Sequence, residues 1–268
     1  MLDSRKLAGV SCALALFALA FAAGCKTDHA AKVAESLDSR ATPYARVDPA
    51  TAGTIAGTVH FSGKAPDRVQ IDMAQDPACN LRGGENDSEQ YVVNNGNLAN
   101  VFVYVKSGLN GKTYAVPSQP AVLDQKGCRY IPHVLGAMAG QTVEFRNSDP
   151  TMHNTHTMDS EISGAGANKS IDISQGPLAS PQTQVFRHPE LMMAVRCNNH
   201  PWMNAFINVV DNPFFAVTDA SGHFEIKGLP PGVYTISAVH EQLGEQSATL
   251  TVLPQKTSSA TFTFTMKK

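Results

Sequence analysis

Short runs of apolar residues occur along most of this chain, and from residue 52 onwards they alternate with glycine, proline, asparagine and aspartate. The runs are rich in valine, isoleucine, phenylalanine, tyrosine and threonine, a composition that predicts β-strands bounded by turns. Strands are expected at 54–61, 91–93, 101–105, 141–145, 192–196, 205–210, 214–218, 223–226, 233–240, 247–252 and 260–266. No stretch has the period of an amphipathic helix, so the pattern predicts an all-β protein made of sandwiches or small barrels.

The first 24 residues follow a different pattern. Arg5 and Lys6 precede an uncharged apolar run over 7–23, and small residues then lead to Cys25. This is the layout of a secretory signal, and the run is short for a membrane-spanning helix. The Ala-Gly-Cys ending resembles the lipobox of bacterial lipoproteins, which implies that Cys25 is lipidated and that Lys26 directs the chain to the outer membrane. A plain signal peptide or an uncleaved anchor are the alternatives.

Residues 25–52 are rich in Ala, Asp, Ser, Thr and Lys and have no sustained apolar period, so they are expected to form a flexible tether. The remaining body is long enough for one sizeable domain or two small ones. The formal net charge of the chain is -2 and its Lys and Arg residues do not cluster. Nucleic acid is therefore not expected as a partner.

The cysteine count leaves one thiol without a partner. Of five cysteines, Cys12 is lost with the signal and Cys25 is expected to be lipidated, which leaves Cys79, Cys128 and Cys197 in an oxidising compartment. Cys79 and Cys128 lie in loop-like contexts and are a possible disulfide pair. Cys197 then requires an intermolecular bridge, a reactive thiol or a metal ion as the explanation.

Candidate metal ligands gather around Cys197. A strand is expected to deliver Cys197 to its end, His200 and Met203 follow in a tight connection, and a second strand leaves. A further strand runs into a polar loop that contains His153. One thiolate, two imidazoles and a weak thioether form the ligand set of blue-copper sites, which suits both Cu(I) and Cu(II).

Two other histidines compete for the role of second imidazole. His156 lies three residues after His153, and we prefer His153 because it directly precedes Asn154. His133 precedes the strand that leads to His153. A loop histidine bonded to the backbone is the simpler interpretation of His133, and an additional metal ligand is the alternative.

The Cys-x2-His-x2-Met spacing, together with the upstream sequence Met-His-Asn-Thr-His at 152–156, resembles the cupredoxins. The short ligand loop with proline after the histidine is most similar to amicyanin. The resemblance spans 101–210 and implies a Greek-key β-sandwich with one copper ion in a mononuclear type 1-like site. The ligands that it implies are His153, Cys197, His200 and axial Met203.

The same resemblance assigns roles to residues beside the ligands. It implies that Asn154 braces the cysteine loop through hydrogen bonds. It also implies that the exposed edge of His200 is the port for electrons, with Pro201 and Trp202 beside it as an apolar docking surface for a redox partner protein.

The end of the chain resembles a second family. Residues 215–236 contain strands separated by Asp-Ala-Ser-Gly and Pro-Pro-Gly turns, a pattern similar to the carboxypeptidase regulatory-like (transthyretin-like) β-sandwich. Residues 53–66 echo the first strand of such modules, so the two parts can be interleaved. The expected organisation is a signal peptide at 1–24, a tether at 25–52, a cupredoxin-like domain at 53–211 and a carboxypeptidase regulatory-like domain at 212–268.

Together these features predict an exported copper protein, periplasmic or tethered to the outer membrane by lipid, that transfers single electrons to a redox partner protein. An enzyme is not expected, because the motifs of common hydrolases and a histidine set for a second copper are missing from the sequence. The alternative is a surface lipoprotein that binds a polymer or protein through its C-terminal sandwich, with copper structural, stored or absent.

Overall fold

The computed structural model describes residues 44–80, 86–158, 160 and 167–266, and strands dominate it. The signal peptide, the lipidation of Cys25 and most of the expected tether lie outside these residues. Within them, no helix is long and apolar enough to cross a membrane. The prediction of an all-β protein with sandwich-like sheets is confirmed, and the described residues contain one short helix, α2 (Pro77–Asn80).

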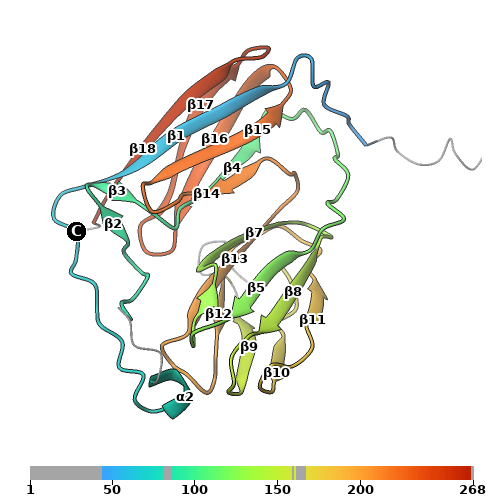
Figure 1. Ribbon diagram of the computed structural model, residues 1–268. Coiled ribbons are helices and arrows are strands. Elements are labelled where there is room, and N and C mark those ends of the chain that lie inside the picture. The colour runs from blue at the N-terminus through green and yellow to red at the C-terminus, as the bar shows by residue number, and fades with distance from the viewer. Residues whose placement is uncertain (1–43, 81–85, 159, 161–166, 267–268) are drawn as a thin grey trace, which may run out of the picture. The chain divides into compact units, whose positions relative to one another are not determined.

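The strands fall into four sheets (Figure 1). Their bounds are β1 (Gly53–Ser62), β2 (Val93–Asn94), β3 (Asn97–Leu98), β4 (Phe102–Ser107), β5 (Ala121–Gln125), β6 (Tyr130–Ile131), β7 (Val134–Met138), β8 (Thr142–Asn147), β9 (His153–Met158), β10 (Asp172–Gln175), β11 (Gln182–Val185), β12 (Glu190–Arg196), β13 (Asn204–Val210), β14 (Phe215–Val217), β15 (His223–Leu229), β16 (Gly232–His240), β17 (Gly244–Val252) and β18 (Thr257–Thr265).

One sandwich joins the two ends of the described chain. Its first sheet has the order β15-β1-β3-β2, with β18 also paired to β1, and its second has the order β14-β4-β16-β17. The inner faces share a core that includes Ile55, Val103, Phe224, Ile236 and Phe262, all nearly inaccessible to solvent. Alternate residues of β15 and β18 are buried and exposed, as expected for strands with one face on a core.

Two strands from the N-terminal part of the described chain, β1 and β4, complete this first sandwich. β1 runs parallel to β18 and antiparallel to β15, and β4 lies between β14 and β16. Residues 53–107 therefore supply strands to the same sheets as residues 212–268, and strand pairing crosses the division expected at 211 and 212. Residues 53–66 were expected to be similar to the first strand of a carboxypeptidase regulatory-like module. The strand pairing gives this similarity a physical basis, because the C-terminal strands bury their apolar faces against β1 and β4.

The second sandwich is formed by the chain between β4 and β14. Its sheets have the orders β10-β9-β12-β13-β7 and β11-β8-β5-β6. Leu123, Phe145, Met193, Val195 and Ile207 are among the residues that fill the core between them. The chain between β4 and β14 thus forms a sandwich inserted into the other one.

Strand β4 connects the two cores because both of its faces are buried. Val103 and Val105 point into the first sandwich, whereas Phe102 and Tyr104 join a smaller cluster with Val134 and other residues of the second. This explains the unbroken apolar run at 102–105 in β4, since a strand segment buried on both faces needs no polar alternation.

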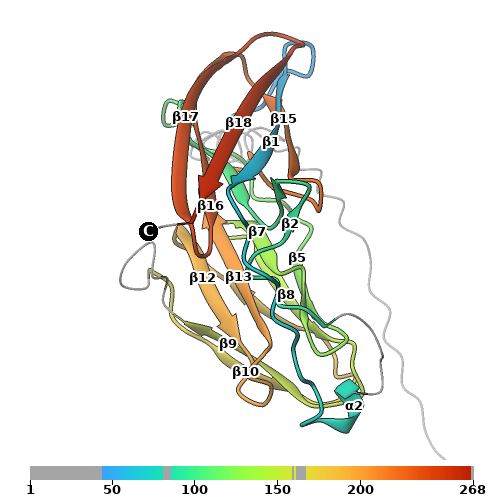
Figure 2. The ribbon, with the colours of Figure 1, turned by 90° about the vertical axis from the view of Figure 1, so that its left-hand side faces the viewer.

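The segment between β1 and β2, here called the strap (residues 63–80 and 86–92), extends along the second sandwich. Figures 1 and 2 show it leaving β1 and reaching α2 at the end of the second sandwich that lies far from the first. A disulfide between Cys79 of α2 and Cys128 attaches the strap there, with 5.6 Å between the Cα atoms. The pair considered from the cysteine count is therefore bonded in the structure, and Cys197 is the free cysteine among the described residues.

Candidate metal centre

Strands β12 and β13 form the hairpin that carries Cys197, His200 and Met203. The N–H of Cys197 donates to the carbonyl of Met203 (3.3 Å), and the N–H of Met203 donates to the carbonyl of His200 (2.9 Å). All three side chains are buried, with exposed fractions of 4% or less. The backbone bonds keep the loop tight, so three soft or borderline donors are presented within one short turn.

Strand β9 supplies the second imidazole. His153 is its first residue and is fully buried, and β9 pairs directly with β12. The Nδ1 atoms of His153 and His200 lie 2.9 Å apart, and Cys197 Sγ lies 3.6 Å from His200 Nδ1. One nitrogen of each ring and the sulfur lie within 4.8 Å of one another, a spacing that can hold one metal ion.

Hydrogen bonds aimed at the sulfur stabilise its charged form. The backbone N–H of Asn154 points at Cys197 Sγ over 3.5 Å. Burial alone disfavours the thiolate, but the hydrogen bonds from His153, Asn154 and His200 outweigh it and lower the pKa of Cys197 to about 6. The metal-free protein therefore already favours a thiolate, the form that binds metals.

Asn154 also holds the loop after Cys197. Its Oδ1 accepts a hydrogen bond from the N–H of Asn198 (2.5 Å), and its Nδ2 donates to Asp172 (2.6 Å). These contacts match the bracing role that the cupredoxin resemblance implies. The carbonyl of Asn154 in turn accepts a hydrogen bond from the buried hydroxyl of Tyr130.

Each imidazole contacts a carboxylate through its outer nitrogen. His153 Nε2 lies 3.1 Å from Asp149, and His200 Nε2 lies 2.9 Å from Asp76 of the strap. Burial lowers the pKa of His153, yet Asp149 and the Cys197 thiolate overcome that effect and raise it to about 9. The hydrogen bond from His200 is the main reason that the pKa of Asp76 is lowered.

These carboxylates were not predicted from the sequence. Asp149 lies only four residues before His153 in the sequence. This short separation could have identified Asp149 as a neighbour of His153. Asp76 is separated from His200 by 124 residues, and no local pattern links the two.

The prediction that one edge of the His200 ring is exposed is wrong for this chain. Only 4% of His200 is exposed, because Asp76 of the strap lies against its outer nitrogen. Trp202 is partly buried, with its ring 5.1 Å from that of His200 and its Nε1–H donating to the carbonyl of Cys128 (3.1 Å). The strap thus covers the edge that the resemblance leaves open.

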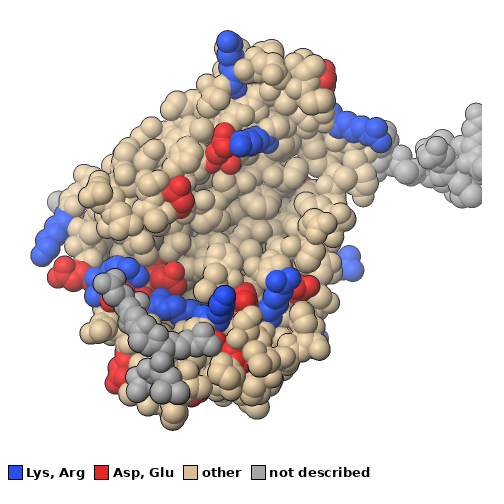
Figure 3. Space-filling view, in the orientation of Figure 1, with Lys and Arg blue, Asp and Glu red and all other residues tan. Residues whose placement is uncertain are grey.

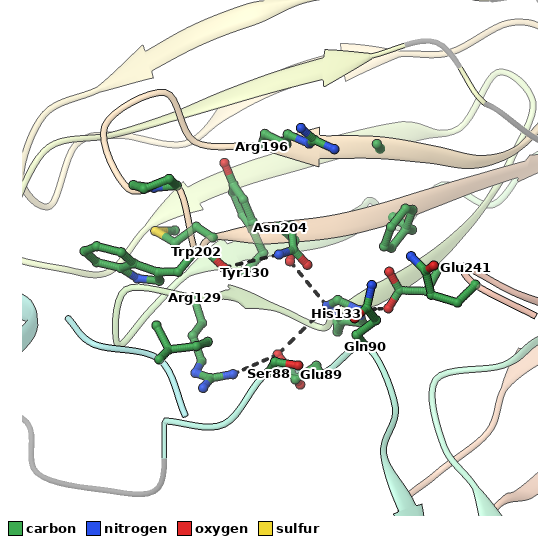
Figure 4. A pocket seen from close by; sticks show the side chains of 16 residues that line it. Ser88, Glu89, Gln90, Arg129, Tyr130, His133, Arg196, Trp202, Asn204 and Glu241 are labelled. Atoms are coloured by element: carbon green, nitrogen blue, oxygen red, sulfur yellow. Dashed lines mark hydrogen bonds and ion pairs between the residues drawn. The ribbon is translucent and has the colours of Figure 1, made fainter. Parts of the chain in front are cut away.

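The two competing histidines lie elsewhere. His156 is on the same strand as His153 but contacts Asn198 through Nδ1 (3.2 Å), outside the donor cluster. His133 lines a separate pocket of about 410 Å³, where its Nε2 lies 2.9 Å from Glu241. Figure 4 shows His133 between the Ser88–Gln90 side of this pocket and the Glu241 side, with Trp202 at the other end.

Charged side chains are unevenly distributed on one face of the molecule. In Figure 3 most of the upper part is uncharged, and Lys, Arg, Asp and Glu residues gather in a band across the lower part. Positive and negative groups are mixed within this band. Among the described residues of this face, the charges therefore do not form a large field of one sign.

Fold and site together define an all-β protein with a buried cluster of one thiol and two imidazoles. Residues 195–267 match the family model of the carboxypeptidase regulatory-like domain, which is just over a quarter of the chain. This match begins in the ligand hairpin and covers the C-terminal strands. No curated protein matches the chain.

Solved structures that resemble part of the chain include copper proteins. A Cu-containing nitrite reductase from Thermus scotoductus SA-01 has 21% identity and a TM-score of 0.31, over 40% of this chain and 26% of that chain. An oxidised amicyanin mutant has 17% identity and a TM-score of 0.29, over 40% of this chain and 97% of that chain. A Cu(I) form of another amicyanin mutant has 19% identity and the same TM-score and coverage. These likenesses to cupredoxins are weak.

Proposed function

We propose that this protein binds one copper ion through His153, Cys197 and His200 and serves in one-electron transfer. The observation that carries the proposal is the convergence of the Cys197 sulfur and the two facing Nδ1 atoms in a buried cluster. A thiolate with two imidazoles is soft enough for Cu(I) and still acceptable to Cu(II), so the donor set fits copper. Bound copper would supply a one-electron couple at this point.

The surroundings of the donors support a site that changes little between oxidation states. His153 is set in a strand, Cys197 and His200 are set in a hydrogen-bonded hairpin, and Asn154 ties the two elements together. Buried and braced ligands resist rearrangement, a property that favours fast electron transfer. Met203 would supply a further, weak thioether ligand, a role that rests on its burial in the same hairpin and on the resemblance to cupredoxins.

Export and attachment to a membrane are part of the proposal. Cys25 would carry lipid and hold the copper domain in the periplasm, at the outer membrane. An oxidising compartment agrees with the Cys79–Cys128 disulfide, since such bonds persist mainly in exported proteins. The partner would be another redox protein.

Titration with Cu(II), followed by voltammetry, tests this function. The wild-type protein should take up one equivalent of copper, develop an intense visible thiolate band and show a reversible one-electron couple. His153→Ala should lose the band, and the matched control His156→Ala, on the same strand, should retain it. A colourless protein whose stability ignores copper would instead favour a non-redox lipoprotein that binds through its C-terminal sandwich.

A further inference from the structure

In each imidazole of the candidate centre, one ring nitrogen faces the other donors and the second ring nitrogen contacts a carboxylate. Their Nδ1 atoms face each other, while Nε2 of His153 contacts Asp149 and Nε2 of His200 contacts Asp76. The side chains of His153 and Asp149 are fully buried, and that of His200 is 5% exposed. Both rings are therefore oriented with the same nitrogen pointing inward.

The carboxylates are themselves fixed by hydrogen bonds. Asp149 accepts from the backbone N–H groups of Gly127 (2.8 Å) and Cys128 (2.7 Å). Asp76 accepts from the hydroxyl of Thr151 (2.8 Å) and from the N–H of Ala78 (2.8 Å). Neither carboxylate depends on the imidazole alone for its position.

The disulfide joins the strap, which carries Asp76, to the loop whose backbone N–H groups hold Asp149. Cys79 Sγ, an Asp76 oxygen and a His200 nitrogen lie within 4.8 Å of one another, and so do the corresponding atoms of Cys128, Asp149 and His153. Asp76 belongs to the strap, outside the sheets that bear the ligands. The Cys79–Cys128 bond is thus a covalent link between the strap and the loop beside the centre.

We propose that Asp76 and Asp149, linked through the Cys79–Cys128 disulfide, are positioning residues that tune the copper centre toward Cu(II). This inference rests on the proposed function. Carboxylates bonded to ligating histidines fix the ring orientation and make the ligand more basic. The buried charge of Asp149 and the partly exposed charge of Asp76 also favour the higher charge of Cu(II) over Cu(I), because electrostatic interactions are stronger where solvent is largely excluded.

Replacing Asp76 by asparagine tests this role. Asp76→Asn keeps the shape of the side chain and removes its charge, so the Cu(II)/Cu(I) equilibrium should shift about tenfold toward Cu(I), which is about 59 mV upward in potential. The matched control is Asp72→Asn, on the same strap, where the exposed carboxylate accepts from the N–H of Ala74. Voltammetry of the copper-loaded full chain measures the shift. A potential for Asp76→Asn equal to that of the control would overturn the proposal.

A second measurement needs no copper. In the metal-free protein, ¹⁵N NMR of the imidazoles should show His200 with its proton on Nε2, facing Asp76, and a changed signal in Asp76→Asn. A proton on Nδ1 in the wild type would overturn the positioning role. Failure of the wild type to bind copper would refute the proposed function instead, so the two failures are distinguishable.

The disulfide is tested by the double variant Cys79→Ser/Cys128→Ser. If this variant folds, its potential should rise in the same direction as that of Asp76→Asn, because the strap is no longer fixed against the centre. An unchanged potential in the folded variant would remove the disulfide from the proposal. If the variant does not fold, Asp76→Asn and the NMR measurement decide the question.

Discussion

The side-chain oxygen of Asn154 accepts a hydrogen bond from the backbone N–H of Asn198, so a residue of β9 holds the loop that follows Cys197. This contact joins the two parts of the chain that supply the candidate ligands. Asn154 is buried and Asn198 is exposed, so the hydrogen bond ties a loop at the surface to a side chain in the interior.

Asn154→Ala should lower the free energy of unfolding of the metal-free protein by about 1–3 kcal/mol, because it removes two side-chain hydrogen bonds of about 0.5–1.5 kcal/mol each. Denaturant unfolding measures this loss. The matched control is Asn204→Ala at the other end of the same loop, where the exposed side chain makes one long hydrogen bond of 3.3 Å. Equal effects of the two variants would contradict the bracing role of Asn154.

The position of β1 in the first sandwich, where it pairs with β18, leads to a second prediction. A Cβ atom on Gly57 would overlap the carbonyl oxygen of Ala260 on β18 and press on Phe224. Gly57→Ala should lower the free energy of unfolding by at least about 2 kcal/mol, since backbone cannot move aside cheaply.

Gly176→Ala is the matched control, because no atom lies within 4 Å of a Cβ built there. Its effect on denaturant unfolding should stay within about 0.5 kcal/mol. If Gly57→Ala were equally harmless, β1 would not pack against β18 as described.

Much of the fold could be predicted from local patterns. The strands rich in valine, isoleucine and phenylalanine, such as β1, β4 and β16, were expected close to their observed positions. Strand β9 was expected to be a polar loop, because its sequence His-Asn-Thr-His-Thr-Met has no apolar alternation. Its polar side chains are buried through specific partners, such as Asp149 and Asn198, that only the tertiary structure supplies.

The same distinction applies to the site. Cys197 and His200 share one hairpin, so their spacing alone indicates a common ligand position. The choice of His153 over His156 depended on a resemblance, and the structure places His153 in the cluster. The contact of Asp76 with His200 could not be predicted, because 124 residues of sequence separate the two.

A buried histidine at the end of β16 predicts a pH dependence of stability. His240 is fully buried, its Nδ1 accepts from the N–H of Gln242, and its ring stacks on Tyr91. Burial first, and then the neighbouring His133, lower the pKa of His240 to about 4 from 6.5. The folded state therefore favours the neutral ring, and its stability is fullest above pH 6.5 and falls as the pH drops toward 4.

The variant His240→Phe keeps an aromatic ring and removes this titration. Between pH 7 and pH 4.5, the metal-free wild type should lose roughly 2 kcal/mol more stability than the variant, at about 1.36 kcal/mol per pKa unit. Urea unfolding at the two pH values measures the difference. Parallel losses in both proteins would show that His240 is not held neutral.

X-ray absorption at the copper edge tests whether Cys197 and two histidines bind copper, because it reports the atoms bound to the metal. In the protein loaded with one equivalent of copper, we expect one short copper–sulfur contact and two imidazole nitrogens, and the sulfur contact should vanish in Cys197→Ser. A spectrum of the wild-type protein with nitrogen and oxygen neighbours only would rule out the proposed ligand set.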